Sequence, residues 1–335
     1  MALIAKKYHG EIVDLHHYGH IAVADTQGKI LWQLGDPQRV VFSRSSAKPM
    51  QAVPVAESGA LDEYGITEKE LAVMCASHYA EDIHTEAVFS ILKKAGLDES
   101  RLQCGTHYPL ASYMKNKFIV GGIKPSEVHN NCSGKHSGML IATKMRSENL
   151  SDYYLPAHPH QMRITQAIAQ ICDYPAEQIV IGSDGCGVPV HAMPMYKFAQ
   201  GYAKMSRPQT LGEGREKTVR RITQAMTDNA QMLGGTGDFT TALTQAFGGR
   251  LFCKGGASGF FAIGLKDKGI GIAVKMEDGS SDIIPLAVLQ TLVQMGEITK
   301  SEAQGLAGFN ESVSLNRKKE VIGKTVADFV LEKTA

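Results

Sequence analysis

The segment Ser43-Arg44-Ser45-Ser46-Ala47-Lys48-Pro49 holds the two side chains of this sequence that are best suited to nucleophilic chemistry. Ser45 and Lys48 form an S-x-x-K pair. On a helix, three residues turn about 300° and rise about 4.5 Å, so both side chains project from one face. A serine at a helix start also feels the positive end of the helix dipole, which stabilises a developing alkoxide. A nearby lysine can take its proton when burial or another cation lowers the lysine pKa.

A second lysine strengthens this interpretation. Lys254 follows an apolar strand and precedes Gly255-Gly256, which is the shape of the K-T-G strand beside S-x-x-K in penicillin-recognising serine hydrolases. The alternative is that the S-x-x-K spacing is fortuitous and that Ser45 is an N-cap. The two motifs together favour a serine nucleophile assisted by lysines, and the N-cap alternative stays open.

Two of the six cysteines lie on glycine-rich turns. Cys132 lies in Asn130–His136 and Cys186 lies in Ser183–Gly187, beside Asp184. Two cysteines, an aspartate and a fourth donor could hold Zn²⁺ tetrahedrally. The usual ligand spacing is absent, and there is no C-x-x-C pair, so buried inert cysteine is the competing interpretation.

Two further segments are weaker candidates. Ser77, in Cys75-Ala76-Ser77-His78, is a small polar residue at the end of an apolar helix, where a site could open. Gly234-Gly235-Thr236-Gly237-Asp238 lacks both G-x-G-x-x-G and the Walker lysine, so a turn that contacts substrate is favoured over a nucleotide site. His158 and His160 have no metal-binding spacing and are expected to be structural or at the surface.

Composition excludes several classes of function. The chain has 335 residues, 43% of them hydrophobic, and a formal charge of +1, so it has no electrostatic footprint for nucleic acid. We expect no membrane span, because 18 consecutive apolar residues do not occur, and no signal peptide, because Lys6-Lys7 interrupts the short apolar start. Six scattered cysteines are typical of a cytoplasmic protein with free thiols.

The elements that must position these residues can be outlined from periodicity and turn signals. A hairpin is expected over 21–33, with its turn at Gly28, and antiparallel strands are expected at 251–253, 260–264 and 271–274. A short strand of the buried type is expected at 179–182. Helices are expected over 45–59, 67–74, 81–94, 133–145, 160–172, 214–232 and 283–295.

This order of elements predicts an α+β fold. An antiparallel sheet would be formed by both chain ends, with a central part, roughly residues 60–230, that is mainly helical. No repeat or linker interrupts the chain, so we expect one unit over 1–335.

Taken together, the motifs resemble those of the L-asparaginase II family, the Rhizobium-type asparaginases. The resemblance is carried by five segments, in family order, which are 43–49, 75–78, 129–136, 182–189 and 254–257. It implies a fold similar to serine β-lactamases and glutaminases, a homodimer, and hydrolysis of L-asparagine.

The resemblance also implies roles for individual residues. Ser45 matches the nucleophile, Lys48 its tandem lysine, and Ser77 and Lys254 a second serine–lysine pair. Arg44, His136 and Gly255 are the implied substrate-binding residues. Cys132, Lys135 and Cys186 match zinc ligands, with Asp184 beside them, and the zinc would assist substrate binding rather than activate water. One departure is Ser258, where the family often has glutamate.

The mechanism expected from these residues is hydrolysis through an acyl-enzyme. Lys48, kept neutral by the charge of Lys254, takes the proton of Ser45, and Ser45 attacks the side-chain amide of L-asparagine. Ser77 relays a proton to the leaving ammonia, and water cleaves the ester. Two alternatives remain. The same residues could serve a glutaminase, another amidase or a β-lactam hydrolase. The chain could instead be a non-catalytic zinc-binding scaffold.

Overall fold

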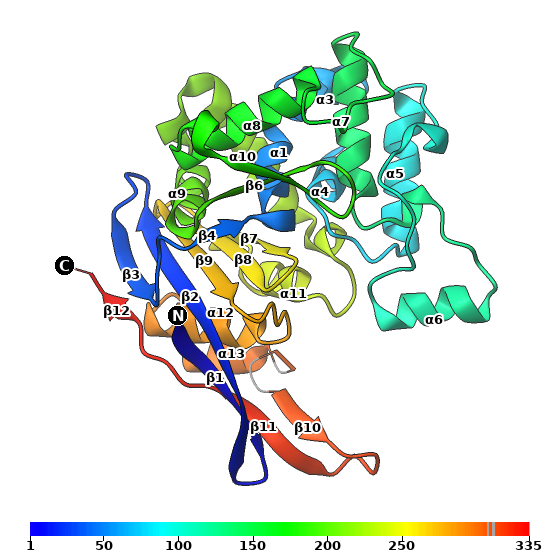
Figure 1. Ribbon diagram of the computed structural model, residues 1–335. Helices are drawn as coiled ribbons and strands as arrows, with labels where there is room; N and C mark the ends of the chain where they lie inside the picture. Colours follow the sequence, from blue (N-terminus) through cyan, green and yellow to red (C-terminus); the bar gives the residue numbers. More distant parts are fainter. Residues whose placement is uncertain (307, 310–311, 335) are drawn as a thin grey trace.

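The centre of the structure is an antiparallel sheet built from both ends of the chain (Figure 1). The computed structural model describes residues 1–306, 308–309 and 312–334. The strand order is β10-β11-β1-β2-β9-β8-β7. Strand β3 pairs with the C-terminal end of β2, beyond the residues that pair with β1, and β12 pairs with β3. The strands are β1 (Ala2–His9), β2 (Ile12–Asp25), β3 (Ile30–Leu34), β7 (Leu251–Gly256), β8 (Phe260–Leu265), β9 (Ile270–Met276), β10 (Ser312–Leu315), β11 (Val321–Ala327) and β12 (Glu332–Lys333). The predicted α+β fold, with its sheet formed by both chain ends, is confirmed.

The segment between β3 and β7 is mostly helical and includes a small sheet of order β4-β6-β5, made of β4 (Val40–Phe42), β5 (Val180–Ser183) and β6 (Pro189–Pro194). Its α-helices are α1 (Lys48–Gln51), α2 (Val53–Ala56), α3 (Ala60–Glu63), α4 (Glu68–Met74), α5 (Asp82–Lys94), α6 (Ser112–Val120), α7 (Ser133–Met145), α8 (Pro159–Cys172), α9 (Met195–Ser206), α10 (Glu213–Asp228) and α11 (Phe239–Phe247). Short 3₁₀ turns include η1 (Arg44–Ala47) and η6 (Ala230–Leu233). Helices α12 (Ile284–Gln294) and α13 (Lys300–Gly305) follow β9. Within the described ranges, no helix combines the length and the apolar character needed to cross a membrane.

Along residues 21–24 of β2 the main sheet is buried on both faces, which explains why this part of the strand is a continuous apolar run rather than an alternating one. Ile21 and Val23 belong to the core that includes α12, whereas Ala22 and Ala24 belong to the core that includes α9. Successive side chains of a strand point to opposite faces. The sheet is therefore a layer between α12 and the helical part of the molecule.

Small residues on the α9 face let that helix lie close to the sheet. Gly264 and Gly271 are cross-strand partners on β8 and β9. A Cβ atom at Gly271 would lie 1.9 Å from the carbonyl oxygen of Ala199 on α9, and one at Gly264 would lie 2.8 Å from that of Tyr202. Since real Cβ contacts are never this short, helix α9 can pack at this distance from the sheet only because both residues are glycine.

The predicted hairpin over 21–33 and the helices near 67–74, 81–94, 133–145, 160–172 and 283–295 are confirmed, with ends shifted by a few residues at most. Three expectations were wrong in detail. The helix expected over 214–232 ends at Asp228, and the separate 3₁₀ turn η6 follows it. The helix expected over 45–59 is divided into η1, α1 and α2, with a proline in the first turn of α1 and of α2. The strand near 179–182 is not buried, because β5 is an edge strand and leaves Val180 55% exposed.

Substituting Gly271→Ala should lower the free energy of unfolding by about 1–3 kcal/mol or more, because the added methyl group overlaps the backbone of α9. Gly214→Ala is the matched control, since a Cβ there meets nothing within 4 Å. This control should be neutral or slightly stabilising, because alanine favours helix more than glycine does. Urea denaturation of both variants checks the prediction, and equal stability of the two would contradict it.

Candidate active site

Ser45 lies in the 3₁₀ turn η1 rather than in the first turn of an α-helix. A 3₁₀ helix has three residues per turn, so residues at i and i+3 lie directly above one another. Ser45 and Lys48 have this spacing, and the Lys48 N–H donates to the Ser45 carbonyl. Ser45 is not an N-cap, because the N-cap of η1 is Ser43 and that of α1 is Ala47.

The backbone just before Ser45 is strained. Arg44 has a φ of +50°, in the left-handed region that side chains with a Cβ rarely adopt. Strain of this kind costs about 1–3 kcal/mol and is concentrated at functional sites. Arg44 turns its guanidinium to Asp184, with an ion pair of 2.9 Å from Nη2 to Oδ1.

A cavity of about 250 Å³ brings several of the predicted residues together. Ser45, Ser77, Lys254 and Gly255 all line it, from three separate parts of the chain. Phe239, Phe261 and Ile284 contribute apolar wall. A larger hollow of about 650 Å³ lies between α10 and α11, but none of the predicted site residues lines it.

Two buried lysines lie beside this cavity. Lys48 is 1% exposed and Lys254 is 2% exposed. The Lys48 Nζ is bonded to the Ala76 carbonyl, to Ser77 Oγ at 3.1 Å and to the Asn131 carbonyl at 3.3 Å. An ammonium would donate all three bonds, whereas a neutral amine would donate to the carbonyls and accept the Ser77 hydroxyl proton.

Lys254 differs in its surroundings. Its Nζ donates one bond, to the Gly255 carbonyl at 2.8 Å. Burial first, and then the nearby positive charge of Lys48, lower the pKa of Lys254 to about 8. Lys254 is therefore an amine that can lose its proton near neutral pH, beside the cavity that Ser45 lines.

The end of β7 is joined directly to the serine turn. Ser46 Oγ donates to the Lys254 carbonyl at 2.7 Å, and the hydroxyl of Tyr202 on α9 donates to the Ser46 carbonyl at 2.7 Å. A Cβ at Gly256 would lie 2.9 Å from the Ser43 carbonyl oxygen. Glycine at this position lets the strand approach η1 closely.

A second cluster contains the predicted metal ligands Cys132, Lys135 and Cys186. The Lys135 Nζ donates to Cys186 Sγ at 3.0 Å, and all three side chains are buried. A hydrogen bond from Cys132, together with the charge of Lys135, lowers the pKa of Cys186 to about 4. Asp184 lies near Lys135, but its Oδ1 is paired with Arg44.

This donor set explains why spacing rules do not find the cluster. In the part of the chain that the structure describes, no three histidine, cysteine, aspartate or glutamate side chains form a metal-binding group. The third donor here is a lysine amine. Two sulfurs and a nitrogen are a combination that suits Zn²⁺, provided that the lysine is deprotonated.

His136, predicted to bind substrate, is fully buried on α7 and does not line the cavity. Its Nδ1 is bonded to the Tyr153 hydroxyl at 2.7 Å. Burial, the largest cause, holds the pKa of His136 well below its usual range, so the ring is neutral.

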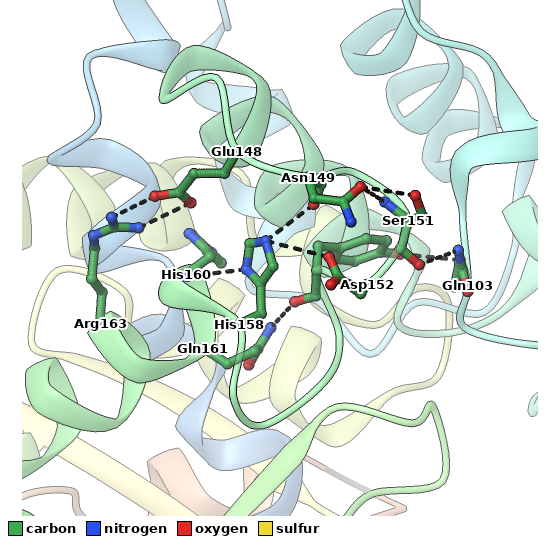
Figure 2. A network of polar contacts seen from close by, with 10 residues as sticks. Gln103, Glu148, Asn149, Ser151, Asp152, His158, His160, Gln161 and Arg163 are labelled. Carbon is green, nitrogen blue, oxygen red and sulfur yellow. Dashed lines mark hydrogen bonds and ion pairs between the residues drawn. The ribbon is translucent and has the colours of Figure 1, made fainter.

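The loop that carries Tyr153 is held by polar contacts between α7 and α8 (Figure 2). His158 Nε2 is bonded to the Asn149 carbonyl at 3.0 Å, and Gln161 donates to the Tyr153 carbonyl at 2.8 Å. Arg163 pairs with Glu148. His158 is thus structural, as the sequence predicts.

Residues that sequence reasoning did not assign also line the cavity. The polar ones among them are Tyr79, Asn131, Asp238, Thr240 and Ser281. Asn131 and Asp238 lie in segments that the motifs marked, whereas Tyr79 had no signal beyond its closeness to Ser77. The family departure at Ser258 lies in the turn between β7 and β8, where the side chain is exposed and does not line the cavity.

Comparison with known proteins was made for the whole chain. No curated protein matches it. Among solved structures it is similar to Mglu in its native form, at 14% identity and a TM-score of 0.45, over 84% of this chain and 64% of Mglu. It is also similar to a beta-lactamase from Mycobacterium bovis, at 14% identity and a TM-score of 0.44, over 84% of this chain and 95% of that one. The chain thus spans less than two thirds of Mglu.

The family comparison covers nearly the whole chain. The model of L-asparaginase II matches residues 5–327, from β1 to the end of β11. The matched range includes every residue of the cavity and of the cysteine cluster. The chain therefore belongs to the L-asparaginase II family.

Proposed function

We propose that the protein is an amidohydrolase that converts L-asparagine to L-aspartate and ammonia through an acyl-enzyme on Ser45. The observation that carries the proposal is the meeting of Ser45, Ser77 and Lys254 around one cavity, with Lys48 bonded to Ser77. Family membership supplies the reaction class.

The first chemical step needs a base for Ser45. We assign this role to Lys254, because its lowered pKa makes the neutral amine accessible near neutral pH. This revises the scheme that made Lys48 the base. As Lys254 takes the hydroxyl proton, Ser45 Oγ forms a bond to the side-chain amide carbon, and backbone N–H groups near the start of the turn stabilise the oxyanion.

The second step releases ammonia. The bond between the amide carbon and nitrogen breaks while the nitrogen gains a proton from Ser77, which is replenished by Lys48 through their 3.1 Å contact. Water then attacks the aspartyl ester, a lysine accepts its proton, and Ser45 Oγ leaves with a proton restored. Acylation therefore leaves Lys254 protonated and Lys48 neutral. In the second half-reaction Lys48 accepts the proton of water and Lys254 returns its proton to Ser45 Oγ, so that the complete cycle restores both lysines.

We also propose that Cys132, Lys135 and Cys186 hold Zn²⁺. The two buried thiols beside the Lys135 amine support the donor set, because zinc binds thiolates and nitrogen donors. When bound, the ion would supply a positively charged contact for a polar group of the substrate.

Replacing the nucleophile provides the first test. Ser45→Ala should abolish release of ammonia and aspartate from L-asparagine, because no acyl-enzyme can form. The matched control is Ser281→Ala, an exposed serine that lines the same cavity and should retain activity. Release of ammonia and aspartate by both Ser45→Ala and the wild type would mean that another residue is the nucleophile, and Ser77 would then be the next candidate.

The same assay with other substrates distinguishes the alternatives. Faster hydrolysis of glutamine or of a chromogenic cephalosporin than of asparagine would change the proposed substrate and leave the proposed catalytic residues unchanged. Bound zinc without labelling of Ser45 by an acylating inhibitor would favour a non-catalytic scaffold.

The pH dependence of the reaction tests the base. A base with a lowered pKa is active above that pKa, so kcat/KM should rise through about pH 8 and level off at higher pH. Lys266→Met, at a half-buried lysine that does not line the cavity, should keep this profile. A rate that does not change between about pH 6 and about pH 10 would remove Lys254 from this role.

Metal analysis tests the second cluster. Purified protein should contain about one zinc ion per chain, and Cys186→Ala should lose it, because two donors hold zinc far more weakly than three. Cys172→Ala, at another buried cysteine, should keep the metal. Equal zinc content in the two variants would contradict the proposed ligand set.

A further inference from the structure

The acidic side chain of the cavity has no role in the reaction as written above. Among the described residues that line the cavity, Asp238 alone carries a carboxylate. It is the N-cap of α11, where Oδ2 accepts the Thr241 N–H at 2.8 Å. Oδ1 accepts a long hydrogen bond of 3.3 Å from the Tyr79 hydroxyl. One carboxylate oxygen therefore stabilises the helix, and the other has capacity for a ligand.

Capping does not account for a charged group here. Asparagine and serine cap a helix about as well as aspartate, without placing a charge beside an apolar wall. Phe239 and Phe261 form part of that wall. The negative charge of Asp238 is thus an unexplained feature of the cavity.

The turn before Asp238 is built around its carboxyl group. A Cβ at Gly234 would lie 2.3 Å from both Cγ and Oδ2 of Asp238. The Gly234 carbonyl accepts the Tyr79 N–H at 2.8 Å, so this glycine connects the two residues that share the contact at Oδ1. Burial, and next the charge of Asp238, raise the pKa of Tyr79, which keeps its hydroxyl protonated as a donor.

We infer that Asp238 binds the α-ammonium group of the substrate and so selects free α-amino acids from among primary amides. The inference rests on the proposed function and names a specificity-determining residue for it. An ammonium has three donors and loses its hydration on entering the cavity, and a carboxylate beside an apolar wall compensates for that loss. Asp238 is the group of the cavity wall that can do so.

A second effect of Asp238 must be separated from binding. Its charge favours the protonated form of Lys254, opposing the effects of burial and of Lys48. If Asp238 acted through Lys254 alone, its removal would shift the pH profile to lower pH. That shift would be the same for every substrate, whether or not the substrate carries an ammonium group.

The experiment compares two substrates that differ in one group. L-Asparagine and succinamic acid have the same side-chain amide and the same carboxylate, but succinamic acid lacks the α-ammonium. In Asp238→Asn, which retains a cap, the ratio of kcat/KM for L-asparagine to that for succinamic acid should fall by about 10- to 100-fold. Most of the loss on L-asparagine should lie in KM, and Ser281→Ala should leave the ratio unchanged.

Each outcome decides one point. An unchanged ratio in Asp238→Asn, or an equal loss on both substrates, would overturn the inference while the proposed function stands. Failure of the wild type to hydrolyse L-asparagine or glutamine would instead overturn the proposed function. If Asp238→Asn does not fold, as judged by circular dichroism, Asp238→Ser provides the same comparison with a hydroxyl cap.

Discussion

The burial of two lysine amines beside one cavity is the constraint on which the site depends. Removing a charge from water costs several kcal/mol unless partners compensate. Lys48 meets this cost with three hydrogen-bond partners, two of them backbone carbonyls. Lys254 has one such partner, and burial with the nearby charge of Lys48 lowers its pKa. The two amines therefore differ in their surroundings, which supports the proposal of Lys254 as the base.

Keeping the lysines close imposes demands on the backbone. The end of β7 must contact η1, so Gly256 has no side chain and Ser46 bonds to the Lys254 carbonyl. The same turn is held from behind by Tyr202 of α9. Helix α9 reaches that position because Gly264 and Gly271 let it lie on the sheet. The small residues of the sheet and the position of η1, which carries Ser45, are therefore parts of one packing arrangement.

Sequence reasoning found those features that depend on local patterns. The helix that begins after Thr67, the hairpin turn at Gly28 and the S-x-x-K spacing depend on neighbouring residues, so they can be identified without a structure. The 3₁₀ form of η1 was not foreseen, because it depends on contacts with β7 and α9. Strand β6 and helix α9 were missed, since β6 is too short to show a period and Pro194 joins the two directly.

The roles of charges were harder to predict than the residues that carry them. The two lysines could be identified from their motifs, but the lowered pKa of Lys254 depends on burial and on the charge of Lys48, which is far away in sequence. The same holds for Asp238, which looks like an ordinary N-cap until the cavity is seen. An ammonium bound by Asp238 would bring a second positive charge near Lys254, in addition to that of Lys48, and would offset the carboxylate that favours the protonated form of Lys254. Substrate binding would then lower the pKa of Lys254 further, so that the amine becomes a base when an amino acid is present to react.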